Sequence, residues 1–453
     1  MKKLEADTPN CNCSICRNKL PFAFPTEIIE AAKNEDLVVF AGAGVSTESK
    51  QVFKFTLYEQ LCDELGIANN QGIDFPSLVS KYCTQINGRQ KFLQLLRYRF
   101  EYVHQYPELY SLATRFHKEL APFWMIKTII TTNWDDYFER ECGAIPIVTP
   151  KDFAFYNMPD RKVFKIHGSI NNYGSIVASK EDYDNCYKEL KNGLIGSYLK
   201  TILATKTVLF VGYSFRDFNF NKIYSFLKKE LHDVLPKSYI VTLDNPQDIK
   251  FKKFNSTIIK TDAAYFLSIL RDHFIKNKFV VDDSSLDYVA TARMFLIDYQ
   301  KNFVLRNRNM IDYPGLLYTV AYQDGLRHGF DYLLYNSKQG KSCNVLEIYS
   351  MIQEYEHKIR PRYMKYRAYH DVAYIDGYIF GLYAIFINEF KNPREIPFLY
   401  IYGLGAIDNE KEFNKRLKNF EKEHKSAYAL AKIILKRSGN NDRDIITSHR
   451  PFL

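Results

Sequence analysis

The sequence predicts an α/β fold: a doubly wound parallel sheet, Rossmann-like, followed by a C-terminal all-α domain. Between Thr26 and about Asp282, short apolar runs alternate with helical stretches, which is typical of a parallel sheet covered by helices on both faces. After about Val280 these runs stop, and helical patterns rich in Tyr, Phe and Leu continue to the end. The 453 residues, 46% of them hydrophobic, suffice for two or three domains.

The predicted strands are continuously apolar rather than alternating, as expected for strands that are buried on both faces. They are 37–41, 127–131, 163–166, 208–211, 239–243 and 257–259. Helices are predicted between them, at 27–33 behind a Thr26 cap, around 183–203, at 219–231 and at 263–276.

This pattern divides the chain into three parts. A cysteine-containing segment covers residues 1–25, the α/β domain covers 26–283, and a helical domain covers 284–453. Acidic and serine residues at 282–285 form the joint and a predicted helix start.

Two segments of the helical domain resemble each other. Residues 321–336 and 373–388 share A-Y-x-D-G-x-x-x-G and a final Asn, so the domain is either a duplicated helical unit or two similar, tightly packed helices. Glycines four residues apart lie on one helical face and allow a second backbone to approach.

The net charge of +10, from 62 Lys+Arg against 52 Asp+Glu, permits an acidic partner without requiring one, so direct nucleic-acid binding stays open. Basic residues concentrate at 411–437, where the apolar spacing predicts an amphipathic helix. Its basic face is either solvated or binds a phosphate or a partner.

No signal-peptide pattern opens the sequence, and the longest apolar stretch, 372–388, carries Asp376 and is too short for a membrane span. We therefore expect a cytoplasmic protein with no membrane contact. Its eight cysteines are expected to be reduced thiols. Cys11, Cys13 and Cys16 have a spacing that suits three zinc ligands, but no fourth ligand lies adjacent in the sequence, and the alternative is a thiol-rich, metal-free terminus.

The first predicted strand leads into A-G-A-G-V-S-T, residues 41–47. Glycines at the end of a strand let the backbone approach a diphosphate, and the hydroxyl of Ser46 or Thr47 can add a hydrogen bond. A G-x-G loop alone is a weak signal, because ordinary strand-to-helix turns also contain it.

Three further segments lie at the carboxyl ends of predicted strands, where doubly wound sheets bind ligands. They are T-T-N-W-D at 131–135, K-I-H-G-S at 165–169 and V-G-Y-S-F-R-D at 211–217. Taken in order with the first loop, these motifs resemble the sirtuin family, and the resemblance covers roughly the first 280 residues.

This resemblance implies NAD as the ligand. It implies that the diphosphate contacts Gly42, Ala43, Gly44 and Ser46, and that the adenosine side contacts Gly212 and Ser214.

The resemblance places Asn133, Asp135 and His167 around the nicotinamide ribose. An imidazole there can accept a proton and a carboxamide can position a water. The alternative for His167 is a core histidine bonded to backbone, and for Asn133 and Asp135 it is helix capping.

The departures from the protein deacylases are also informative. Those enzymes carry a module with paired cysteines after the H-G motif, whereas between Gly168 and Val208 this sequence has Cys186 alone, so we expect no zinc there. The sequence resembles instead the zinc-free, NAD-consuming sirtuin-like domains of bacterial anti-phage systems.

This second resemblance implies an NAD glycohydrolase that releases nicotinamide and ADP-ribose, silenced in resting cells. It implies a homo-oligomer and an activating partner, such as a HerA-type ATPase, an Argonaute or a phage protein. The alternatives are a module that senses NAD or a related nucleotide without cleaving it, and a protein deacylase.

Overall fold

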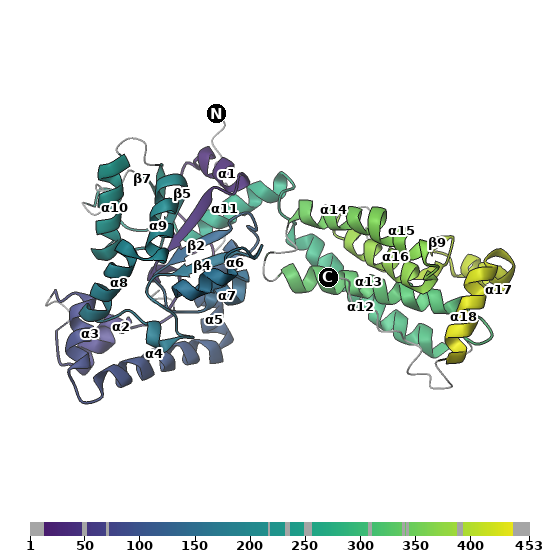
Figure 1. Ribbon diagram of the computed structural model, residues 1–453, viewed down its shortest axis with the longest axis horizontal. Coiled ribbons are helices and arrows are strands. Elements are labelled where there is room, and N and C mark those ends of the chain that lie inside the picture. Colours follow the sequence, from purple (N-terminus) through teal and green to yellow (C-terminus); the bar gives the residue numbers. More distant parts are fainter. Residues whose placement is uncertain are drawn as a thin grey trace. The chain divides into compact units, whose positions relative to one another are not determined.

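The computed structural model describes residues 13–47, 52–68, 72–215, 218–231, 236–248, 256–306, 310–337, 340, 344–386 and 393–437 (Figure 1). The chain divides into two compact units, Met1–Phe274 and Ile275–Leu453.

The first unit is built on a seven-stranded, all-parallel sheet with the order β3-β4-β2-β1-β5-β6-β7. The strands are β1 Leu37–Ala41, β2 Thr128–Thr131, β3 Ile145–Ile147, β4 Lys162–Lys165, β5 Thr207–Val211, β6 Ser238–Thr242 and β7 Ser256–Lys260. The chain runs outward from β1 in one direction and then returns to β5 on its other side. The carboxyl ends of β1 and β5 therefore meet where the strand order reverses, which is where such sheets bind ligands.

The predicted fold class is confirmed, and the six predicted strands are present with ends that shift by about one residue. The strand β3 was not predicted. It has three residues, contains Pro146 and lies at the edge of the sheet, the position in which a strand tolerates a proline.

Helices cover both faces of the sheet. On one face, alternate side chains such as Phe40 and Phe210 pack against α8, α9 and α10. Figure 1 shows α1, α6, α7 and α11 on the other side. These helices are α1 Thr26–Lys33, α6 Arg115–Leu120, α7 Tyr137–Cys142, α8 Lys180–Asn192, α9 Leu194–Thr205, α10 Phe218–Leu231 and α11 Ala263–Lys276.

Two details of the helix prediction were wrong. Thr26 is the first residue of α1 and not its cap. The N-cap residue is Pro25. The helical stretch predicted around 183–203 is two helices, because Gly193 adopts an extended conformation between α8 and α9.

A group of helices is inserted between β1 and β2. They are α2 Leu57–Glu64, α3 Phe75–Cys83, α4 Gly88–Gln105 and α5 Pro107–Ala113. Asp74 caps α3 by accepting a hydrogen bond from the Ser77 amide, and Thr56 and Glu59 form a capping box on α2. These helices form their own apolar cluster, which also includes Tyr137, Ile170 and Ile176 from the strand-end segments of the sheet.

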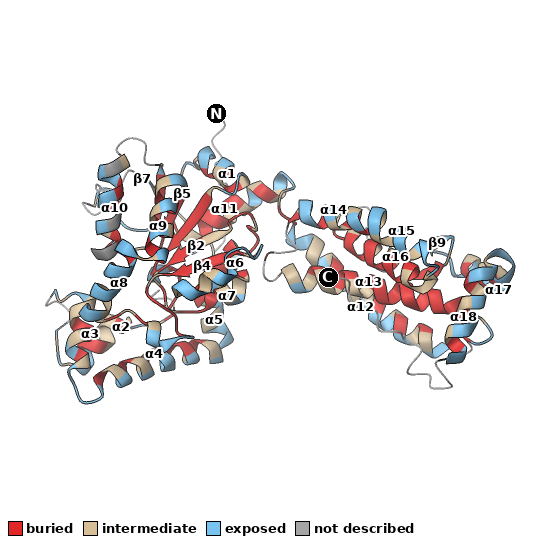
Figure 2. Ribbon diagram, in the orientation of Figure 1, coloured by how far each residue is buried: buried red, intermediate tan, exposed pale blue. Residues whose placement is uncertain are grey.

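The second unit is predominantly helical. Its helices are α12 Asp283–Arg306, α13 Leu316–Ser337, α14 Val345–Glu354, α15 Arg360–Lys365, α16 Tyr369–Tyr383, α17 Glu410–Glu423 and α18 Lys425–Arg437, with a π-helical turn at Tyr355–Ile359. Figure 2 shows that α13 and α16 are the most continuously buried of them. The expectation that strands stop after Val280 was wrong in one place, because Leu399–Ile401 (β8) and Gly405–Ile407 (β9) form a short antiparallel hairpin.

The two similar segments of the helical unit pack against each other. A Cβ on Gly325 would lie 1.9 Å from the carbonyl oxygen of Tyr374, and one on Gly377 would lie 2.0 Å from that of Tyr322. The contact is reciprocal, since each glycine meets the backbone three residues before the other. Asn388, the last residue of the similarity, lies outside the described residues.

The basic stretch 411–437 is two helices rather than one, because His424 interrupts the helical backbone between α17 and α18. The predicted apolar face is otherwise present: Phe413, Leu417, Phe420, Ala427 and Ala431 are buried, whereas Ile434 is partly exposed.

At the N-terminus, Cys13 and Cys16 lie in turns, and Cys11 falls outside the described residues. The described cysteines are thiols. Within the described part of the chain, each helix is too short or too polar to cross a membrane.

Candidate active site

The loops after β1 and β5 lie against each other. The Gly42 amide donates to the Val211 carbonyl and the Gly44 amide to the Gly212 carbonyl, both at 3.0 Å. A Cβ on Gly42 would lie 2.6 Å from the Gly212 carbonyl oxygen, so a larger residue would push the loops apart. These glycines therefore serve the packing of the two loops in addition to any approach to a ligand.

The loop after β1 exposes backbone and buries hydroxyls. Ala43–Val45 form a 3-10 turn, in which Ala43 and Gly44 are exposed. Ser46 and Thr47, by contrast, are buried beneath the turn. A ligand can thus reach the main chain of the turn directly.

The neighbouring loop after β5 is also open. Gly212 is partly exposed and Ser214 is exposed. Gly212 has a φ of +55°, in the left-handed region that a glycine adopts without strain. The predicted diphosphate and adenosine residues thus come from adjacent loops on one edge of the sheet.

Asn133, two residues after β2, is held tightly on one side of its amide. Its Nδ2 donates to the Gly42 carbonyl at 3.1 Å and to Ser46 Oγ at 3.2 Å, and its backbone amide donates to Thr131 Oγ1 at 3.0 Å. The side chain is buried, yet Oδ1 has no hydrogen-bond partner among the described residues. A buried polar atom without a partner is costly, and this oriented oxygen is available to accept a hydrogen bond from a ligand or a water.

Asp135 belongs to the same network and also supports the next helix. Its Oδ1 accepts from the amide of Tyr137, the first residue of α7, at 3.3 Å, although the N-cap residue of this helix is Asp136 and not Asp135. Burial raises the pKa of the Asp135 carboxyl, while the charge of Lys165 and a hydrogen bond with Ser46 oppose the rise. The carboxyl therefore serves local structure and lies within the candidate site.

His167 follows the adjacent strand. Thr131 of β2 pairs with Lys165 of β4, so Asn133 and His167 each lie two residues beyond a paired position. The His167 ring is buried and lies 5.0 Å from the ring of Tyr183 on α8.

A sharp turn follows His167. Gly168 has a φ of +85°, and its Cβ would lie 2.1 Å from the Ser175 carbonyl oxygen, so glycine is required there. The His167 carbonyl accepts from the Val177 amide at 3.0 Å, which fixes His167 beyond the carboxyl end of β4.

The inserted helices reach the candidate site through Trp134. Its ring lies 6.1 Å from that of Phe75 on α3 and 6.3 Å from that of Phe92 on α4. Asn133 is therefore bordered by this apolar cluster as well as by the loop after β1.

Cys186 lies on α8, and its Sγ donates to the Ile166 carbonyl at 3.6 Å. Within the ranges that the structure describes, no group of three or more His, Cys, Asp or Glu side chains is arranged to hold a metal ion.

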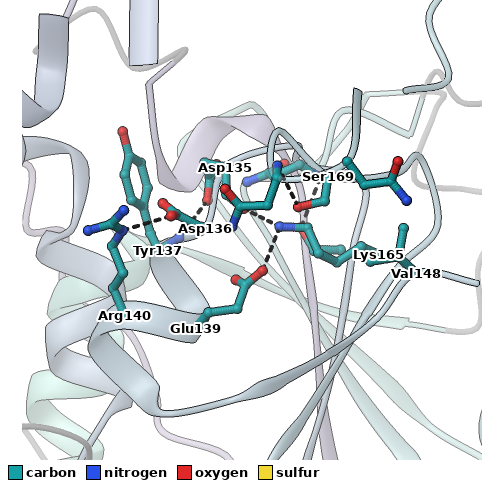
Figure 3. Close-up of polar contacts among 12 residues, drawn as sticks. Asp135, Asp136, Tyr137, Glu139, Arg140, Val148, Lys165 and Ser169 are labelled. Atoms are coloured by element: carbon teal, nitrogen blue, oxygen red, sulfur yellow. Dashed lines mark hydrogen bonds and ion pairs between the residues drawn. The ribbon is translucent and has the colours of Figure 1, made fainter. Parts of the chain in front are cut away.

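Lys165 and Glu139 were not predicted to have a role, yet they contact each other, and Lys165 also contacts the backbone of Asp135 (Figure 3). A signal for Lys165 was present, because a charged residue stands in the apolar run V-F-K-I. Glu139 gave no such signal, since acidic residues are common in the first turn of a helix.

Comparisons with known proteins concern the family to which the sequence is similar. Residues 127–264 match the model of the SIR2-like domain family. The chain is 26% identical to Defense-associated sirtuin 2 of Bacillus subtilis, over 68% of this chain and 30% of the relative. It is 34% identical to NAD(+) hydrolase ThsA of Cytobacillus dafuensis, over 42% of this chain and 38% of the relative. It is also 26% identical to NAD(+) hydrolase ThsA of Enterococcus faecium, over 63% of this chain and 55% of the relative.

The chain thus spans less than two thirds of the length of each of these relatives. The family resemblance drawn from the four strand-end motifs is confirmed. Residues 127–264 thus match a SIR2-like domain, and the chain is similar in sequence to a defence-associated sirtuin and to ThsA NAD(+) hydrolases.

Proposed function

We propose that the protein is an NAD glycohydrolase that cleaves NAD to nicotinamide and ADP-ribose and acts in the cytoplasm in anti-phage defence. The proposal rests on the strand-end site and on the relatives named NAD(+) hydrolase and defense-associated sirtuin. The exposed turn at Ala43 and Gly44 would take the diphosphate, with the hydroxyls of Ser46 and Thr47 beneath it. The loop that carries Gly212 and Ser214 would take the adenosine side.

The observation that carries the proposal is the orientation of Asn133. Its Nδ2 is fixed by Gly42 and Ser46, which leaves a buried Oδ1 free of hydrogen bonds within the described part of the chain. An acceptor held in this way binds a water or a ribose hydroxyl without reorganising, which favours a reaction that develops charge at the ribose. Helix capping alone does not explain it, because both Nδ2 bonds are made to the loop after β1.

The chemistry follows from these positions. A water molecule oriented by Asn133 Oδ1 attacks the ribose carbon that bears nicotinamide, and a carbon–oxygen bond forms as the carbon–nitrogen bond breaks. The bonding pair leaves with nicotinamide, which becomes neutral, and the proton of the water passes to the imidazole of His167. Asp135, connected to Ser46, keeps the network around Asn133 in place.

Incubation of the full chain with NAD, followed by chromatographic identification of the products, tests the proposal. We expect nicotinamide and ADP-ribose in equal amounts, unchanged by a metal chelator, and increased by an activator if the enzyme is silenced at rest. Binding of NAD without product, under every activating condition, would favour the sensing module instead. A requirement for an acyl-peptide would favour a deacylase.

We propose further that the helical unit controls the activity by holding copies of the chain together or by contacting an activating protein. An enzyme that consumes NAD must be restrained in resting cells, and a HerA-type ATPase, an Argonaute or a phage protein could release it. We expect the full chain to be a homo-oligomer by light scattering. A chain ending at Asp283 should form smaller assemblies with altered basal cleavage, and equal assembly and activity of both forms would remove the helical unit from control.

A further inference from the structure

The floor of the candidate site contains a buried ion pair. Lys165, the last residue of β4, has a side chain that is 0% exposed, and its Nζ lies 3.0 Å from Glu139 Oε1 in the first turn of α7. The same ammonium donates a hydrogen bond to the backbone carbonyl of Asp135. Figure 3 shows Lys165 reaching both partners from the side of the sheet.

This ion pair is not explained by stability. Burial removes hydration from both charges, and their mutual attraction recovers that loss only in part, so an apolar replacement of similar volume is often no less stable. Burial raises the pKa of the Glu139 carboxyl even though Lys165 acts against the rise. The second oxygen of Glu139 has no partner among the residues described.

The ammonium connects the two segments that carry the candidate catalytic side chains. Lys165 is the last residue of β4, and His167 follows it two residues later. On the other side, the Lys165 ammonium donates to the carbonyl of Asp135, which lies two residues after Asn133. The intervening Trp134 is also fixed, because its carbonyl accepts from the Ile170 amide at 2.7 Å. Lys165 thus ties the loop after β2 to the strand that presents the histidine.

We infer that Lys165, oriented by Glu139, is a positioning residue that sets the placement of Asn133 relative to His167. This inference rests on the proposed NAD cleavage and deepens it. Hydrogen bonds from a charged donor are stronger than neutral ones, and small displacements of catalytic groups lower turnover strongly. The hydrogen bonds of Lys165 Nζ are made to Glu139 and to the Asp135 carbonyl, and not to the loops that would take the diphosphate and adenosine, so substrate binding should change little.

The test replaces the pair by groups of similar size in Lys165→Met/Glu139→Gln, so that neither member of the pair is left charged without the other. Lys162→Met is the matched control, because Lys162 is a buried lysine at the other end of the same strand that donates to the carbonyls of Met158 and Asp160 at 2.5 Å. We expect kcat for nicotinamide release to fall at least tenfold in the double variant while KM changes less than about threefold. The control should keep the kcat of the unaltered chain.

Single substitutions of Glu139 test the inference even if the double variant does not fold. Glu139→Gln retains an oxygen that accepts from the ammonium and should keep most of kcat, whereas Glu139→Ala should lose it. A kcat in the folded double variant within twofold of the control overturns the inference. If the double variant does not fold, equal kcat in Glu139→Ala and Glu139→Gln overturns it.

Amide hydrogen exchange separates this inference from the proposed function, because it needs no turnover. The double variant should exchange faster than the control over residues 132–137, with 37–47 and 207–212 unchanged. If that increase is seen but the unaltered chain releases no nicotinamide under any activating condition, the proposed function fails and the positioning role stands. If the unaltered chain is active and neither exchange nor kcat changes in the double variant, the positioning role fails.

Discussion

Both units bring two backbone segments together through glycines, yet the surroundings of the two contacts differ. In the first unit, Gly42 and Gly44 meet Gly212 between loops at the edge of a sheet, and the turn beside them is exposed. In the second unit, Gly325 and Gly377 bring two helices together, and both glycines are buried.

The polar groups beside the two contacts differ as well. Next to the helix pair, the hydroxyls of Tyr318 and Tyr322 donate to backbone carbonyls at 2.7 and 3.1 Å, so these hydroxyls are used in packing. Next to the loop pair, Asn133 retains an oriented acceptor without a partner in the described residues. Close glycines therefore do not distinguish a ligand site from tight packing. Exposed backbone does, whereas a buried polar atom without a partner among the described residues lies beside both contacts, Asn133 Oδ1 at the loops and Gln323 Oε1 on α13.

The largest expected effect is on turnover, through side chains beside the paired loops of the first unit. Asn133→Ala and His167→Ala should each lower nicotinamide release about a hundredfold or more, because each removes a positioned group from the reacting centre. Asn171→Ala is the control, since Asn171 is exposed on the turn after His167. A correctly folded variant at either position with turnover close to that of Asn171→Ala would show that the ribose assignment is wrong.

The next largest effect is on the stability of the contact between α13 and α16 in the second unit. Gly377→Ala places a Cβ 2.0 Å from the Tyr322 carbonyl oxygen, so the helices must separate, at a cost of about 3 kcal/mol or more. Amide exchange in α13 and α16 should report this loss. Gly174→Ala is the control, because a Cβ there meets only the Asn172 side chain, at 3.6 Å. Unchanged protection of α13 in Gly377→Ala would mean that the close approach is not needed for packing.

A smaller effect concerns the pH dependence of the unfolding free energy, to which the buried His117 contributes. Burial, together with the charge of Lys165, lowers the pKa of His117 from 6.5 to about 3. The fold therefore favours neutral His117, and this contribution is complete above about pH 6.5 and is lost as the pH falls toward 3. Between pH 7.5 and pH 5.0 we expect the unaltered chain to lose about 2 kcal/mol more unfolding free energy than His117→Phe does.

Tryptophan fluorescence suits this measurement, because Trp124 and Trp134, the two tryptophans of the chain, both lie in the first unit. Urea unfolding of both proteins at the two pH values gives the difference. Parallel losses in the two proteins would show that His117 does not carry this pH dependence.

The sequence predicted the parts of this molecule that depend on local pattern. Continuous apolar runs placed the strands, and the order of motifs at their ends identified the SIR2-like domain. The edge strand β3 was not predicted from the sequence because it has three residues and a proline. The β8–β9 hairpin was not predicted because its strands are equally short. The Lys165–Glu139 pair escaped for another reason: it joins residues 26 positions apart on a strand and a helix, and no local pattern encodes such a contact.

The most direct test of the account asks where NAD binds on the full chain. Amide exchange of His167→Ala, chosen to prevent turnover, is compared with and without saturating NAD. The account predicts protection in the turns at 42–47, 132–136 and 212–215, with no direct protection at 321–329 or 373–381. Protection confined to the two helix segments, or saturable NAD binding that leaves the strand-end turns unchanged, would contradict the claim that this edge of the sheet is the NAD site.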